Sequence, residues 1–93
     1  MAETLLLEVA TPERLLVRER VHEAQIPCRN GYIGVLPGHA ALLSELGSGR
    51  LSYAGDGGAG SLHISGGWVE VLDDHIRVLA DVAGEQPGSE IAR

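Results

Sequence analysis

The stretch Gly31-Tyr32-Ile33-Gly34-Val35-Leu36-Pro37-Gly38-His39-Ala40-Ala41-Leu42-Leu43 sets three glycines and one proline among apolar side chains. This mixture fits neither a helix interior nor a regular alternating strand, because glycine allows positive φ and proline lacks an amide hydrogen. Pro37 and Gly38 suit the second and third positions of a type II turn over residues 36–39. The residue before a proline favours extended backbone, so we expect a short strand over residues 32–36 to end there. The turn then fixes the direction in which His39 points.

The composition around this stretch fits one small all-β domain. Leu, Val and Ile dominate the apolar residues of the 93-residue chain, and Phe is absent. Such a core of branched aliphatic side chains suits strands packed face to face. Glycines and prolines interrupt the sequence at short intervals, as turns do between strands. We therefore expect a small antiparallel β-sandwich or flattened barrel of about 8–10 short strands over residues 1–83.

Alternating apolar side chains predict individual strands on both sides of the stretch. Leu5, Leu7 and Val9 share one face of the segment 4–9. Alternating runs at 51–53 and 62–64 flank the glycine-rich segment 55–60, which predicts a hairpin with a flexible tip. A second hairpin joins the runs 68–72 and 75–80.

The segment 14–26 fits two structures. Thr11 can cap a helix and Pro12 can open it, with Val17, Val21 and Ala24 as its apolar stripe. The same residues fit strands equally well, so the residues alone leave helix and strand as equal alternatives.

Charge and cysteine content exclude several classes of protein. The formal net charge of −6, with basic residues that form no cluster, argues against nucleic-acid binding. Cys28 is the single cysteine, so no internal disulfide and no oxidising compartment are indicated. The apolar run 4–10 is too short for a membrane span and contains Glu8. We expect a protein that reaches a membrane only through a partner.

The residues that often carry chemistry do not form a site in the sequence. His22, His39, His63 and His75 stand at no metal-ligand spacing. We expect His63 and His75 to face solvent. For His39, a hydrogen bond to a carbonyl of its own loop and a contact with a partner are equal alternatives.

Four further patterns give no evidence of a site. The segment 55–60 lacks the Lys-Ser/Thr ending of a phosphate loop, and Gly31-x-x-Gly34 lacks the helices and basic residues of a nucleic-acid clamp. Asp73 and Asp74 suit a turn, where aspartate makes local hydrogen bonds, and no nucleophile accompanies them. A single neighbour, Arg29, is weak support for a reactive thiol at Cys28. We expect no catalytic, nucleotide-binding or metal site and no cofactor.

Apolar side chains in excess of the core indicate a partner. Leu6, Tyr32, Leu36 and Trp68 cannot all be buried in so small a sandwich. A contiguous exposed apolar group marks an interaction surface. The sequence therefore predicts an interaction protein.

Three blocks carry a family resemblance. They are Gly-x-x-Gly-Val-Leu-Pro-Gly-His-Ala at 31–40, Ile-Ser-Gly-Gly-Trp-Val-Glu-Val at 64–71 and Val-Leu-Ala-Asp at 78–81. With this order and spacing, the segment 21–81 resembles the ε subunit of the rotary F-type ATP synthase. The resemblance implies that family's N-terminal β-sandwich domain, and it favours strands over the segments 15–18 and 21–26.

The resemblance also implies a function. It implies a non-catalytic subunit of the central rotating stalk, which couples proton or sodium flow to ATP synthesis. One sheet face would bind the γ subunit, and the glycine-rich loop end would rest on the polar loops of the membrane-embedded c-ring. The ring-proximal rim would then comprise Gly31, Tyr32, Gly34, Pro37, Gly38, His39 and Ala40. Tyr32 replaces an acidic residue often found between these glycines, which favours an apolar or hydrogen-bonded contact over a salt bridge. In a bacterium the subunit would lie peripherally at the cytoplasmic face of the inner membrane.

The C-terminal residues change in composition. Gly, Glu, Gln, Pro and Ser predominate over residues 84–93, which predicts a linker, and Ser89 can cap a first helical turn. In the family a helical hairpin begins here, so the chain is either cut at the domain boundary or a naturally short form. Without that hairpin, we expect the chain to leave ATP hydrolysis by the catalytic head largely uninhibited.

Two other functions compete with this interpretation. A free-standing β-sandwich would bind a small molecule or carbohydrate in a rim pocket lined by Trp68, Tyr53 and Tyr32. A small hydrolase would need a nucleophile paired with a base, and the sequence shows none.

Overall fold

Eight β-strands make up the computed structural model, which describes residues 3–84, and no helix occurs among these residues. The strands are β1 (Leu5–Ala10), β2 (Leu15–Val21), β3 (Glu23–Cys28), β4 (Gly31–Val35), β5 (Leu42–Glu45), β6 (Ser48–Gly55), β7 (Gly58–Leu72) and β8 (His75–Gly84). The all-β prediction is confirmed, and the ambiguous segment 14–26 consists of two strands. The predicted linker lies outside the described residues from residue 85 onward.

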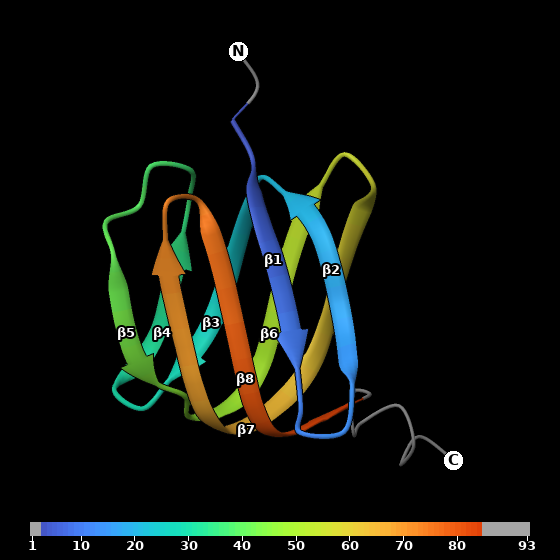
Figure 1. Cartoon of the computed structure of the whole chain (residues 1–93), viewed down its shortest axis with the longest axis vertical. Helices are drawn as coiled ribbons and strands as arrows, with labels where there is room; N and C mark the ends of the chain where they lie inside the picture. Colours follow the sequence, from blue (N-terminus) through green and yellow to red (C-terminus); the bar gives the residue numbers. More distant parts are fainter. Residues whose placement is uncertain (1–2, 85–93) are drawn as a thin grey trace.

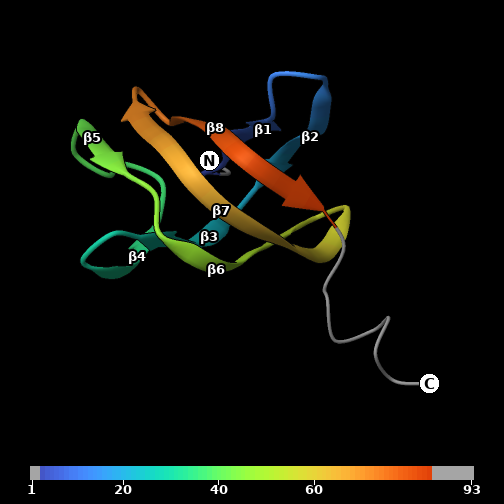
Figure 2. The same ribbon diagram turned by 90° about the horizontal axis from the view of Figure 1, so that it is seen from below.

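The strands form one sheet that folds into two layers. Their order is β2-β1-β8-β7-β6-β3-β4, and β5 pairs with β7. β5, β8, β1 and β2 lie in the front layer of Figure 1, and β4, β3 and β6 lie behind them. Figure 2 shows the two layers from below. The arrangement is the expected sandwich, but its layers are continuous through shared strands, and β1 runs parallel to β8.

The core lies between the layers and is aliphatic. Alternation in β1 places Leu5, Leu7 and Val9 inside, as predicted, and all three are fully buried. The other large, fully buried side chains come from both layers: Val21, Ile26, Val35, Leu51, Ile64, Val69, Val71, Ile76 and Val78. No charged or polar residue of the described chain is buried. The interior side chains therefore account for the fold, and we expect functional residues on the surface.

The longest strand, β7, joins the two layers by bending. Its first part pairs with β6 and its last part with β5. Between these parts Gly66 and Gly67 have φ of 74° and 110°, which favours glycine over other residues. A side chain at Gly67 would also overlap the carbonyl oxygen of Leu79. The two glycines thus allow one strand to serve both layers, and β7, with 15 residues, is longer than the short strands expected.

The two predicted hairpins differ from each other. β6 and β7 remain paired as far as Gly55 and Gly58, so the tip is a two-residue turn and the expected flexible loop is absent from this hairpin. In the β7–β8 turn, Asp73 and Asp74 both have positive φ, at 51° and 60°, as a type I′ turn requires. This turn lies beside the loop between β4 and β5 (Figure 1).

Candidate interaction surfaces

The proline-glycine turn forms as predicted. The amide of His39 donates to the carbonyl oxygen of Leu36 over 3.0 Å, and Gly38 has φ of +86°. The Nδ1 atom of His39 lies 2.7 Å from the carbonyl oxygen of Ala40. Of the two alternatives for this histidine, the structure thus supports the local hydrogen bond.

The seven predicted rim residues lie along β4 and in the loop after it. Gly31, Tyr32 and Gly34 belong to β4, which begins beside the β3–β4 turn. Pro37, Gly38, His39 and Ala40 belong to the loop at the other end of the strand (Figure 1). Because a strand advances about 3.4 Å per residue, the two groups are separated by roughly the length of β4. They form two neighbouring surfaces, which we call the Tyr32 end and the Pro-Gly loop (residues 36–41).

The Tyr32 end is exposed and polar. The Tyr32 side chain is 57% exposed, and its hydroxyl accepts a hydrogen bond from the amide of Arg50 over 3.0 Å. The ring lies so close to Gly49 of the back layer that a side chain there would overlap it. Nearby, Arg29 Nη1 lies 2.7 Å from Glu45 Oε1. This end therefore offers an aromatic ring amid charged and hydrogen-bonding groups.

An apolar surface covers part of the front layer. Leu43, Trp68 and Leu79 line one shallow groove with Glu70 and Arg77 at its polar side. Trp68 and Leu79 also line an adjoining groove, which contains Thr11 and Pro12. The three large side chains are 50–68% exposed. We call Leu43, Trp68 and Leu79 the apolar face, and its contiguity is the property expected of a partner surface.

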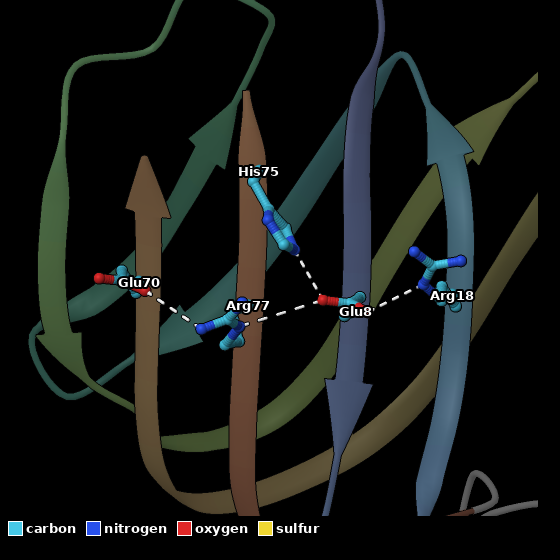
Figure 3. Close-up of polar contacts among 5 residues, drawn as sticks. All are labelled: Glu8, Arg18, Glu70, His75 and Arg77. Carbon is cyan, nitrogen blue, oxygen red and sulfur yellow. Dashed lines mark hydrogen bonds and ion pairs between the residues drawn. The ribbon is translucent and has the colours of Figure 1, made fainter. Parts of the chain in front are cut away.

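Beside the apolar face, charged side chains of alternating sign cross four strands (Figure 3). Glu8 on β1 bonds to Arg18 on β2 over 2.9 Å and to His75 on β8 over 2.7 Å. Arg77 lies 4.0 Å from both Glu8 and Glu70. The hydrogen bond from His75, followed by that from Arg18, holds the pKa of the Glu8 carboxyl below its ordinary value. These charges compensate one another across the four strands.

Sequence reasoning missed this cluster because its members are distant in the chain. Glu8 and His75 become neighbours only through the parallel pairing of β1 with β8. His75 lies on the outward side of β8, as predicted, but its side chain is only 32% exposed because it packs against Glu8. Asp74 also differs from expectation, because its carboxylate accepts a hydrogen bond from the distant amide of Gly38 over 2.7 Å.

The structure does not assemble the site that the competing binding function needs. Tyr53 and Trp68 line different depressions, one between β3 and β6 and the other on the front layer. The Tyr32 hydroxyl contacts β6 instead.

Among residues 3–84, no group of three or more His, Cys, Asp or Glu side chains is arranged to hold a metal ion. No helix in this part of the chain is long and apolar enough to cross a membrane.

The fold and its surfaces define a class: a small β-sandwich domain that presents interaction surfaces. Residues 4–86 match the family model of the ATP synthase delta/epsilon chain β-sandwich domain. The chain is 56% identical over 93 residues to the ATP synthase epsilon chain of Solibacter usitatus. The alignment spans all of this chain and 69% of that relative. It is 41% identical to the epsilon chain of Koribacter versatilis, again over its whole length and 66% of the relative.

Solved structures agree with the sequence relatives. A chain of the Euglena gracilis mitochondrial ATP synthase, in a structure of OSCP, F1 and c-ring, superposes with a TM-score of 0.83 at 26% identity, over 99% of this chain and 61% of that one. A chain from the central stalk and c-ring of the Tetrahymena thermophila enzyme has a TM-score of 0.73 at 16% identity, over 99% and 75% of the two chains, and supports the fold. The chain belongs to the delta/epsilon chain family of ATP synthase. Within that complex it is a non-catalytic stalk component, and it spans about two thirds of the length of its curated relatives.

Proposed function

We propose that the domain links the γ subunit to the c-ring and thereby couples proton or sodium flow to ATP synthesis. The observation that carries the proposal is the apolar face, whose three large side chains lie together in one groove and are 50–68% exposed.

The apolar face suits γ. Permanent interfaces are more apolar than the rest of a protein surface, with aromatic residues enriched at their centre. Trp68 lies between the two grooves and is the natural anchor of such a contact. Leu72 extends the outward side of β7 from Trp68 toward the β7–β8 turn. The Pro-Gly loop adjoins that turn, so we assign this loop to the γ contact as well.

The Tyr32 end suits the polar loops of the c-ring. Its exposed ring, the Arg29–Glu45 pair and the hydroxyl of Tyr32 provide hydrogen-bonding and ionic contacts. Of the seven residues expected at the ring, Gly31, Tyr32 and Gly34 therefore remain in that role. Pro37, Gly38, His39 and Ala40 are assigned to γ. The domain would lie peripherally at the membrane, on its cytoplasmic face in a bacterium.

A binding experiment with separate partners tests the assignment. Immobilised γ and purified c-ring are each incubated with the wild-type chain and with Trp68→Ala, Tyr32→Ala and Val82→Ala. We expect Trp68→Ala to lose γ and retain the ring, and Tyr32→Ala to do the opposite. Val82→Ala is the control, because Val82 is exposed and lines neither groove. Binding of neither partner by the wild-type chain, or equal effects of both variants on both partners, would refute the proposal.

A further inference from the structure

The Pro-Gly loop is joined to the rest of the described chain by a single hydrogen bond. Its other two hydrogen bonds are internal, from the amide of His39 to Leu36 and between the ring of His39 and Ala40. The external bond runs from the amide of Gly38 to Oδ1 of Asp74 over 2.7 Å. A charged acceptor makes this bond stronger than one between neutral groups.

Asp74 is itself held firmly on both sides. It occupies the type I′ turn between the paired strands β7 and β8, which fixes its backbone. Its carbonyl oxygen also accepts a hydrogen bond from the amide of Leu6 over 2.9 Å, which ties the turn to β1. The carboxylate is therefore presented from a rigid part of the sandwich to a loop that lacks another attachment of this kind.

We propose that Asp74 is a positioning residue for partner binding, because its carboxylate holds the Pro-Gly loop in the orientation that γ contacts. The inference rests on the proposed function and adds a residue to it. Leu36 is 59% exposed, and its position relative to the apolar face depends on how the loop is anchored. Without the carboxylate, the loop would have to be ordered during binding, and the lost conformational entropy would weaken association.

The β7–β8 turn supplies matched variants. Asp74→Gly removes the acceptor and still adopts positive φ without strain. Asp74→Asn keeps an acceptor oxygen and tolerates the same backbone. Asp73→Gly makes the same chemical change at the neighbouring position, whose carboxylate forms no hydrogen bond with any described residue. The three variants separate the effect of the carboxylate from that of the turn.

Two measurements on the chain test the proposal. Amide exchange by NMR reports whether Gly38 is held, and titration of the catalytic head complex that carries γ reports affinity. For Asp74→Gly we expect Gly38 to exchange at least about tenfold faster and γ affinity to fall about tenfold, equivalent to ~1.4 kcal/mol. Asp74→Asn should restore part of both values, because its amide oxygen accepts the hydrogen bond but carries no charge, and Asp73→Gly should change neither.

The possible failures are distinguishable. Unchanged exchange at Gly38 in Asp74→Gly would overturn the positioning role itself. Faster exchange with unchanged affinity for γ would overturn its link to binding. Failure of the wild-type chain to bind γ would refute the proposed function and, with it, the claim that the loop serves γ, whereas the exchange data would still decide whether Asp74 holds the loop.

Discussion

Gly67 shows how much a single residue contributes to this fold. It combines φ of +110° with backbone contact to Leu79, so alanine there would meet both torsional strain and steric overlap. We expect Gly67→Ala to lower the free energy of unfolding by about 3 kcal/mol or more. Gly31→Ala is the control, because its φ is also positive but its surroundings are open. Urea denaturation should show a loss of about 1–2 kcal/mol for the control, and equal losses would contradict the overlap.

Glu8 should make the thermal stability of the domain depend on pH in the acidic range. Hydrogen bonds from His75 and Arg18 lower the pKa of the folded carboxyl from 4.5. The resulting stabilisation is present above the unfolded pKa and is lost as pH falls through the folded pKa. We expect the wild-type chain to have a higher Tm than Glu8→Gln near neutral pH, with the gap closing in acid. Thermal unfolding followed by circular dichroism measures this, and a gap that is constant with pH would exclude the mechanism.

At the scale of a strand, the two faces of β8 have different roles: one face stabilises the fold and the other is proposed to bind γ. Ile76 is fully buried, whereas Leu79 on the other face is 52% exposed in the apolar face. We expect Ile76→Ala to cost about 2–5 kcal/mol of stability. Leu79→Ala should change stability by no more than about 0.5 kcal/mol and should weaken γ binding. Chemical denaturation and titration with γ measure the two effects, and destabilisation of similar size by both variants would show that Leu79 belongs to the core.

Local chemistry explains which elements the sequence could predict. Period-2 alternation identified β1 and parts of β6, β7 and β8, and Pro37-Gly38 identified the turn, because each depends on adjacent residues. The parallel pairing of β1 with β8 and the bond between Gly38 and Asp74 depend on residues far apart in the chain. Periodicity has no information about such contacts. The same limit explains why the Glu8 cluster was missed.

At the scale of the whole molecule, the Tyr32 and Trp68 rings of the two proposed partner surfaces lie on different layers, and Glu45 of the Tyr32 end is paired with Trp68 across β5 and β7. Tyr32 lies over Gly49 of the back layer, and Trp68 lies between grooves of the front layer. The two layers enclose one aliphatic core. Interiors packed in this way deform little, so a load applied at one surface is transmitted to the other by the body as a unit. A linker of this kind needs no moving part.

A rigid body with two partner surfaces makes a quantitative prediction. Effects of substitutions at distant, uncoupled sites add within about 0.3–0.5 kcal/mol, whereas coupled sites deviate further. We therefore expect the binding free energy that Tyr32→Ala and Trp68→Ala lose together, measured on the complete membrane-bound complex, to equal the sum of the single losses within that margin. Val82→Ala combined with either variant gives the baseline for the comparison. A larger deviation would mean that one contact alters the other through the core, in which case the domain acts as a flexible coupling between γ and the ring.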